Sequence, residues 1–342
     1  MHMADALLSP AVGGAMWAVS AGAIIYCSRK LRKEMDGGKA PLMGVLGAFL
    51  FAAQMINFTI PATGSSGHLG GGLLLAVLLG PAAAFITIAS VLVVQALFFA
   101  DGGLLALGCN IFNLGFLPAF LAYPLIYKPL AGNAPNKPRI AVAAMVAAIV
   151  GLQLGAFAVV LETVASGISS LPFATFVSLM QPIHLAIGVV EGLVTGAVIS
   201  FVHQARPEII RSVQEDRPLG ATPLRNVLVA FLAAALLTGG FVSWFASKNP
   251  DGLEWAIAKV TGGEESAEVR AGSGLHARLA ALQEAIAFLP EYTFKKSEQQ
   301  PENVAGQESP LGTSVAGIVG GLLTLAIAFL SGKFLRKQGR VA

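Results

Sequence analysis

The chain has 342 residues, of which 55% are hydrophobic and only 12% are charged. With a mean hydropathy of +0.72, it is too apolar for one soluble core and is typical of a protein that crosses a membrane several times. The net charge of +3 is small and dispersed, which argues against a nucleic-acid partner, and the two cysteines, Cys27 and Cys109, lie in apolar segments, which argues against a disulfide framework.

Apolar runs of helical length follow one another along the chain. They occupy residues 9–28, 41–60, 69–99, 103–127, 139–163, 182–203, 225–246 and 312–331. The third run is too long for one crossing. Gly80-Pro81 within it predicts a break, because proline starts a helix far more easily than it continues one. We therefore expect a short helix, a turn and a second helix there, and nine crossings in all.

Basic residues gather in four clusters between these runs. The clusters are Arg29–Lys33, Lys128–Arg139, Arg206–Arg225 and Lys333–Arg340. Because cytoplasmic loops carry the excess of lysine and arginine, an even number of crossings should separate each pair of clusters. Nine crossings satisfy this rule and eight do not. We therefore expect the amino terminus and the GSSGHLGG segment outside, and the carboxyl terminus inside.

The apolar runs fall into two groups. Residues 1–205 hold seven crossings, the charged segment 206–224 is expected to be a cytoplasmic linker, and residues 225–342 hold two more crossings. Between these two lies a polar external loop at 247–311, whose mixed charge predicts a small, partly ordered excursion. The predicted fold is an all-α polytopic membrane protein, a seven-helix bundle with two further transmembrane helices.

The first residues, MHMADALLSP, carry a group that can chelate a metal. The terminal amine of Met1, the amide nitrogen of His2 and the Nδ1 atom of His2 close five- and six-membered rings around one ion. These three coplanar nitrogens suit square-planar Ni(II) or Cu(II), or Co(II), better than tetrahedral Zn(II). Many unrelated chains begin Met-His, so an ordinary solvated terminus is the alternative.

His68 lies in ATGSSGHLGGG, on the same predicted external side as His2. Its small neighbours permit a close approach of the backbone, so His68 is a candidate for the fourth nitrogen. The alternative is a loop histidine that meets lipid headgroups or caps the following helix. His276, in the external loop, is expected to be solvated.

His184 and Glu191 lie seven residues apart in one apolar run, near the same helix face. Ionisable residues inside a membrane are costly, which marks the pair for attention. A bond between packed helices and a role in transport both remain open for it.

Three motifs of catalysis or nucleotide binding are absent from the sequence. There is no GxxxxGK[ST] phosphate loop, so we expect that the chain is not its own ATPase. Neither HExxH nor GxSxG occurs, which argues against a metalloprotease and a serine hydrolase. We expect a protein that is not an enzyme.

Four motifs resemble the substrate-specificity subunit of energy-coupling-factor nickel and cobalt transporters, the CbiM/NikM type. They are MHMADALLS at the start, QMINFTIPATGSSGHLGGGLLLAVLLGP from Gln54, QALFFADGGLLALGCNIFN from Gln95 and EGLVTG from Glu191. In that family the amino-terminal segment enters the helical core and binds the metal. The resemblance therefore implies Met1, His2 and His68 as ligands.

The resemblance also implies that three other residues of the second motif surround these ligands and orient them. They are Gln54, Asn57 and Ser66. One position departs from the family pattern, because Ala6 stands where glycine commonly follows the aspartate. That change affects the turn after the chelate and removes no ligand.

The sequence NPDGLEWAI, from Asn249, resembles the Pro-Asp-Gly-Leu-Glu motif of the small N-type subunit of the same systems. The chain therefore looks like a fusion of the two subunits. The resemblance implies capture of Ni(II) or Co(II) outside the cytoplasmic membrane for ATP-driven import, with a transmembrane coupling subunit and ATP-binding cassette ATPases as partners. The metal is the transported substrate, and nickel and cobalt are not separated.

Three other classes of function stay open. A membrane metal sensor or assembly protein would bind the ion without moving it, and a stand-alone secondary carrier would move it without an ATPase. A membrane enzyme is the third, although no clear constellation of a nucleophile or an open metal position supports it.

Overall fold

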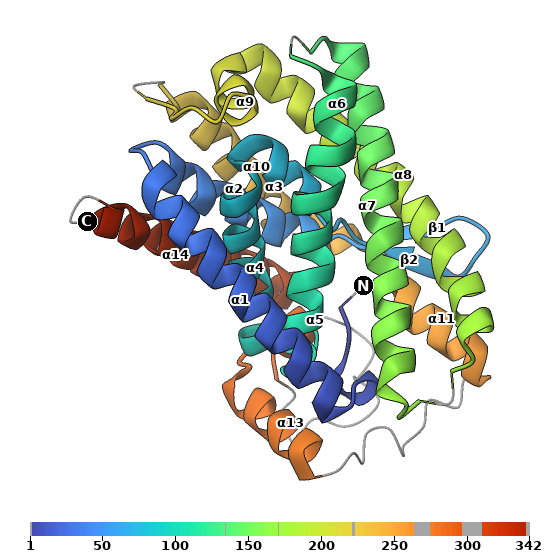
Figure 1. The fold of residues 1–342 in the computed structure, drawn as a ribbon. Coiled ribbons are helices and arrows are strands. Elements are labelled where there is room, and N and C mark those ends of the chain that lie inside the picture. The colour runs from blue at the N-terminus through green and yellow to red at the C-terminus, as the bar shows by residue number, and fades with distance from the viewer. Residues whose placement is uncertain are drawn as a thin grey trace.

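The computed structural model describes residues 2–133, 135–169, 171–220, 223–262, 274–295 and 310–339. Within these ranges, six helices are long and apolar enough to cross a membrane, and two shorter apolar helices, α2 (Lys39–Gln54) and α10 (Arg225–Gly240), accompany them. The predicted all-α polytopic architecture is confirmed (Figure 1). The six long helices are α1 (Pro10–Glu34), α4 (Pro81–Phe99), the continuous helix Leu107–Ala131, α7 (Lys137–Ser166), α8 (Phe173–Ala205) and α14 (Pro310–Gly339).

The third apolar run breaks at Gly80-Pro81, as predicted. Gly80 has a φ of +83°, and Pro81 begins α4 directly after it. The piece before the break, α3 (Gly72–Leu79), has only 8 residues, which gives a rise of about 12 Å against a hydrocarbon core of about 30 Å. α3 is therefore the short helix that the sequence predicts before the break, and it is too short to cross a membrane by itself; the number of crossings stays a prediction. All of α3 is buried, so it lies inside the bundle.

The helix Leu107–Ala131 changes its winding along its length. It begins as α5 (Leu107–Ile111), continues as a π-helix, η2 (Phe112–Tyr127), and ends as α6 (Lys128–Ala131). η2 contains Pro118 and Pro124, each of which lacks the N–H that a helix interior uses. π-helical turns are frequent at functional sites, and the start of this helix faces the buried amino end of the chain.

Glycines bring α8 close to α7. A Cβ atom placed on Gly188 would lie 2.9 Å from the Cα of Ile149, and one on Gly192 would lie 2.8 Å from the Cα of Met145. Their spacing of four residues therefore permits close helix packing. Gly14, on α1, has no atom within 4 Å of such a Cβ and belongs to an exposed face of its helix.

A short β-hairpin interrupts the helices. It lies at the end of the bundle that the basic clusters predict to be external. β1 (Phe58–Ile60) pairs antiparallel with β2 (Ser65–Gly67), with Phe58 opposite Gly67. The sequence did not predict it, because the second apolar run was expected to remain helical to residue 60. The hairpin leads directly into His68 and so fixes where this histidine begins its approach to the core.

The carboxyl-terminal module packs on the first bundle. α10 and α14 both contact α2, and α14 also contacts α4 and α1. Between them the chain forms η3 (Val242–Phe245), α11 (Gly252–Thr261), α13 (Gly274–Ile286) and η4 (Pro290–Tyr292). α11 and α13 lie at one end of the bundle and α9 (Pro207–Gln214) at the other (Figure 1).

The predicted linker, residues 206–224, contains a helix that the sequence analysis did not anticipate. α9 buries Ile209, Ile210 and Val213 and packs against α3 and α8. These three apolar side chains lie on one face of a short amphipathic helix. The segment therefore closes the end of the bundle and does not act only as a tether.

Candidate metal-binding site

The amino-terminal segment is buried in the bundle. Met3 and Leu8 have no exposed surface, the side chain of His2 is 7% exposed, and the amino end lies among the helices (Figure 1). Such burial requires partners for the backbone, since an unpaired buried N–H or C=O is costly. Met1, a predicted ligand, lies outside the described residues.

Asn110 of α5 pairs with both backbone groups of Met3. The Met3 N–H donates to Asn110 Oδ1 at 2.8 Å, and Asn110 Nδ2 donates to the Met3 carbonyl at 3.3 Å. The Gly103 N–H donates to the same carbonyl at 2.9 Å. These bonds fix the residue next to His2 inside the bundle.

The chain turns back toward α1 at Asp5. Asp5 begins η1 (Asp5–Leu7), and its Oδ1 accepts a hydrogen bond from the Ala106 N–H at 2.9 Å. Burial raises the pKa of the Asp5 carboxyl. Ser9 then caps α1 by accepting from the Val12 N–H. Ala6, the departure from the family pattern, lies within η1.

The two predicted histidine ligands lie side by side. The rings of His2 and His68 stack with their centroids 4.9 Å apart and an angle of 15° between their planes. Nδ1 of His2 lies 2.8 Å from Oδ1 of Asp101, and its Nε2 is buried with no hydrogen-bond partner among the described residues. Burial alone would raise the pKa of Asp101, but the contact with His2 holds that pKa below its usual range.

A hydrogen bond to the backbone sets the tautomer of His68. Its Nδ1–H donates to the Leu69 carbonyl at 3.1 Å, which puts the lone pair on Nε2. Burial lowers the pKa of His68 to about 3, and the neighbouring His2 adds to the shift. A neutral imidazole is the form that binds metal ions.

Glu191 and Gln54 hold the backbone that follows His68. The Glu191 carboxylate accepts from the N–H groups of Gly70 and Gly71, at 2.7 and 2.9 Å. On the other side, Gln54 donates through Nε2 to the Gly70 carbonyl at 2.9 Å, and its Oε1 accepts from Gln95 at 3.0 Å. Gly71 has a φ of +74°, a conformation that favours glycine.

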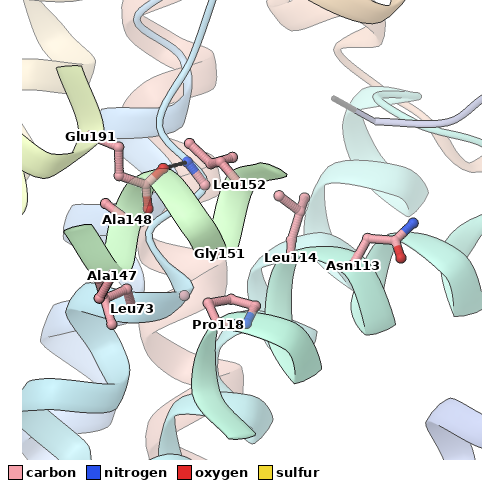
Figure 2. A pocket seen from close by; sticks show the side chains of 11 residues that line it. Leu73, Asn113, Leu114, Pro118, Ala147, Ala148, Gly151, Leu152 and Glu191 are labelled. Atoms are coloured by element: carbon pink, nitrogen blue, oxygen red, sulfur yellow. Dashed lines mark hydrogen bonds between the residues drawn. The ribbon is translucent and has the colours of Figure 1, made fainter. Parts of the chain in front are cut away.

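A cavity of about 10 Å³ lies beside Glu191, with room for about one water molecule. Figure 2 shows Glu191 at one side of it, with its carboxylate toward a backbone nitrogen, and Asn113 at the other side. Leu114, Pro118 and Leu152 lie between them. Because the lining is mostly apolar and neither His2 nor His68 takes part in it, this cavity is separate from the histidine pair.

Ser66 and Asn57 bond to the carboxyl-terminal module. Ser66 donates its backbone N–H to the Pro250 carbonyl and its hydroxyl to the Asn249 carbonyl, both at 2.8 Å. The Asn57 carbonyl accepts from the Ser247 N–H at 2.7 Å. These contacts attach the hairpin, and Asn57 directly before it, to residues 247–250 of the carboxyl-terminal module.

The PDGLE segment (Pro250–Glu254) is ordered by its own helix cap. Asp251 accepts from the N–H groups of Leu253 and Glu254, and Glu254 accepts in return from the Asp251 N–H, which forms a capping box at the start of α11. Trp255 then donates its ring N–H to the Thr63 carbonyl at 3.0 Å. The segment thus lies on the hairpin that carries His68.

α13, which lies between α10 and α14 in the chain, packs over the amino-terminal segment. His276 of α13 donates through Nε2 to the Leu8 carbonyl at 2.9 Å, so the expectation of a solvated His276 is wrong. Gln283 donates to the carbonyls of Ala96 and Gly102, at 2.9 and 2.7 Å. α13 therefore connects the amino-terminal segment with the loop that carries Asp101.

His184 does not join the histidine pair. It is fully buried, and its Nδ1–H donates to the Met180 carbonyl one turn back in α8, at 2.8 Å. A Cβ atom on Gly252 would lie 3.2 Å from its Cε1, so the ring forms part of the surface on which the PDGLE segment rests. Among the described residues, no three His, Cys, Asp or Glu side chains gather as a metal site.

A family description matches the larger part of the chain. Residues 2–209 match the cobalt uptake substrate-specific transmembrane region. The chain belongs to this family. Residues 225–337 match the PDGLE domain, so the predicted resemblance to a CbiM/NikM-type subunit fused to an N-type module is confirmed.

Two relatives that are named as fused nickel transport proteins align with nearly the whole chain. A putative fused nickel transport protein NikMN from Archaeoglobus fulgidus is 30% identical, with 98% of this chain and 99% of the relative aligned. A fused nickel transport protein NikMN from Rhodobacter capsulatus is 29% identical over 95% of each chain. A crystal structure of a truncated transition metal transporter has a TM-score of 0.53 and 31% identity, and covers 60% of this chain and 99% of its own.

Sequence reasoning missed Asp101 and Asn110, which contact His2 and Met3. Both lie in the segment QALFFADGGLLALGCNIFN, whose resemblance was noted without a role for either residue. The available signal was their polarity: each is a polar residue next to or within an otherwise apolar run, where a buried polar group needs a partner.

Proposed function

We propose that this chain captures Ni(II) or Co(II) at its external face and delivers the ion for ATP-driven import, as the specificity component of an energy-coupling-factor transporter. The observation that supports the proposal is the buried amino-terminal segment, which places the ring centroids of His2 and His68 4.9 Å apart. Burying a polar segment is costly unless its polar groups are hydrogen-bonded, as the bonds to Met3 and Asp5 provide here. The proposed ligands are the amine of Met1, the amide and Nδ1 nitrogens of His2, and Nε2 of His68.

The chelate requires one rearrangement. Nδ1 of His2 now faces Asp101, whereas a five- and six-membered chelate uses Nδ1 as a ligand. A half-turn of the ring about its Cβ–Cγ bond turns Nδ1 away from Asp101 and brings the Nε2–H side toward that carboxylate. Carboxylates commonly accept from the second nitrogen of a ligating histidine, so Asp101 has a role in both orientations.

The energy for import is proposed to come from partner subunits. The chain has no phosphate-binding loop of its own, and the family description is that of a substrate-specific transmembrane region. The partners are a transmembrane coupling subunit and ATP-binding cassette ATPases in the cytoplasmic membrane. The basic clusters favour an external amino terminus and an internal carboxyl terminus.

Both nickel and cobalt fit the proposed donors. The fused relatives carry nickel in their names, and the family description carries cobalt. A planar set of four nitrogens favours nickel over cobalt in the Irving–Williams order. Copper would bind more tightly than either, so its exclusion would depend on availability.

The carboxyl-terminal module is proposed to load or stabilise the amino-terminal plug. Its PDGLE segment bonds to the hairpin before His68, and its α13 bonds to the tail at Leu8. The two histidine-bearing segments are thus held by two parts of one module. Metal uptake that survives deletion of residues 225–342 would contradict this role.

The decisive test is metal binding to purified protein with an intact Met1. Mass-resolved stoichiometry and Ni(II) or Co(II) optical spectra would be compared for wild type, His2→Ala and His68→Ala. We expect one tightly bound ion with a planar-nitrogen spectrum, lost in both variants. His203→Ala, at the cytoplasmic end of α8, is the matched control and should bind normally. Unchanged binding in the first two variants would overturn the site.

Uptake assays separate the remaining classes of function. With the full set of partner subunits, cells should accumulate the ion, and loss of the ATPase should abolish accumulation. Uptake that survives loss of the ATPase would identify a secondary carrier. Binding without accumulation in the presence of all partners would identify a sensor or assembly protein.

A further inference from the structure

Asp101, the residue that contacts His2, is itself held by the carboxyl-terminal module. Its Oδ1 faces His2 Nδ1 at 2.8 Å, and its Oδ2 accepts a short hydrogen bond from the hydroxyl of Tyr292, in η4. The two oxygens of one carboxylate therefore connect the predicted metal ligand with a residue of the other module. The backbone of Asp101 is fixed as well, since its N–H donates to the Gln95 carbonyl at 3.1 Å.

Tyr292 is placed by packing that does not depend on its hydroxyl. Its ring stacks on Phe99, with centroids 5.1 Å apart and planes at 20°, and meets Phe51 edge-on at 6.1 Å. The Leu289 N–H donates to the Phe98 carbonyl at 3.3 Å. The end of α4 thus receives the ring, and the hydroxyl reaches Asp101 from a fixed position.

We propose that Tyr292 is a positioning residue for the metal site: it holds Asp101 in the orientation that aligns the His2 ring. This inference rests on the proposed function, because it assumes that His2 binds the ion. An aspartate at the end of a helix rotates readily about its side-chain bonds, and a second hydrogen bond to its far oxygen removes that freedom. Outer partners of this kind commonly change metal affinity by about 10- to 100-fold.

The proposal assigns the hydroxyl and the ring of Tyr292 different roles. The ring attaches η4 to α4, whereas the hydroxyl acts on His2 through Asp101. Removing the hydroxyl should therefore leave the docking of the module intact and change the metal site alone. In a variant whose residue 101 no longer aligns His2, removing the Tyr292 hydroxyl should not change metal affinity further.

The test is a double-mutant cycle on the full chain. Ni(II) affinity, dissociation rate and optical spectrum would be measured for wild type, Tyr292→Phe, Asp101→Asn and the double variant. We expect Tyr292→Phe to weaken binding by about 10-fold and to shift the Ni(II) spectrum. The double variant should bind no more weakly than Asp101→Asn, because both changes act on one chain of contacts.

Two further variants make the outcome unambiguous. Tyr123→Phe removes a buried hydroxyl that has no hydrogen-bond partner among the described residues, and it should bind Ni(II) as wild type does. His2→Ala tests the proposed function itself, so retention of binding there would reject the site and not only the role of Tyr292. If His2→Ala abolishes binding but Tyr292→Phe binds like wild type, or if the Tyr292 and Asp101 effects add, the positioning role is refuted.

Discussion

At the scale of single residues, Glu191 is the buried carboxylate on which the loop after His68 depends. It accepts from two successive backbone N–H groups, Gly70 and Gly71. In Glu191→Gln only one side-chain oxygen remains to accept, so one buried N–H loses its partner. We expect a loss of about 1–3 kcal/mol in the free energy of unfolding and weaker metal binding, measured by thermal unfolding in detergent and by Ni(II) titration.

An exposed glutamate provides the control for this change. Glu208→Gln, at the start of α9, removes a charge from the surface and should stay within about 0.5 kcal/mol of wild type. Equal stability and metal affinity in wild type and Glu191→Gln would mean that the two glycine N–H groups do not need the carboxylate.

Asn110 is expected to control how long the amino-terminal segment stays inserted. Asn110→Leu keeps a side chain of similar size but removes the acceptor of the Met3 N–H and one of the two donors to the Met3 carbonyl, which keeps its bond from Gly103. Because the tail is then held less firmly, bound Ni(II) should dissociate faster when a chelator competes for it. The measurement is the dissociation rate under excess chelator.

A stability-matched variant separates release from general destabilisation. Asn136 caps α7 at the other end of the bundle by accepting from the Arg139 N–H, and Asn136→Ala should cost about 1 kcal/mol. Its metal dissociation rate should nonetheless match wild type. Faster release in this variant as well would show that lowered stability, and not the tail anchor, controls release.

The sequence predicted some of these residues for chemical reasons and missed others for topological ones. His2 is recognisable because a histidine beside the terminal amine can chelate a metal, and His68 because it lies among small residues on the same predicted side of the membrane. Their ligand role stays a prediction. For Glu191 the sequence left two roles open, a bond between packed helices and a part in transport. Its bonds to a loop backbone are a third arrangement, which the spacing of residues along one helix cannot reveal. Asp101 and Tyr292 meet only through the docking of the second module.

At the scale of elements, Gly252 is the point where the PDGLE segment rests on α8. A Cβ atom there would lie 2.6 Å from Cγ2 of Ile183 and 3.2 Å from Cε1 of His184. We expect Gly252→Ala to cost about 1–3 kcal/mol through overpacking and to slow metal loading, because the segment must move away from the hairpin. Unfolding in detergent and the rate of Ni(II) binding measure the two effects.

A second glycine of the same loop serves as the control for Gly252→Ala. At Gly274, the start of α13, no neighbouring atom of the described residues lies within 4 Å of the place that the Cβ of an alanine would take. Gly274→Ala should therefore bind Ni(II) at the wild-type rate. A Gly252→Ala variant that loads metal as fast as Gly274→Ala would contradict the docking role of the PDGLE segment.

Long apolar elements were predictable and short ones were not. The break before α4 followed from Gly80-Pro81, since proline has a definite preference at a helix start. The three-residue strands of the hairpin and the eight residues of α9 are too short for a periodic pattern to emerge above chance. Their structure depends on tertiary contacts: β2 bonds to the PDGLE segment, and α9 packs on α3.

At the scale of the whole molecule, the second module packs on the first mainly through α14 and α10 against α2, and the chain between these two helices reaches the segments around the histidines. The first bundle supplies His2, His68 and Asp101, while the second contributes contacts to the hairpin, the amino-terminal segment and Asp101. A division of labour follows, in which one module carries the proposed ligands and the other restrains the segments that bear them. This arrangement requires the loop between α10 and α14 to lie on the side from which metal arrives.

That orientation is testable with single cysteines, because the native Cys27 and Cys109 are both buried and should react little. Lys259, on α11, and Arg211, on α9, are exposed at opposite ends of the bundle. In intact cells a membrane-impermeant maleimide should label Lys259→Cys, whereas Arg211→Cys should react only after permeabilisation. The basic clusters motivate this orientation. The reverse pattern would place the histidine pair at the cytoplasmic face, where it could not capture an external ion, and would overturn the proposed direction of transport.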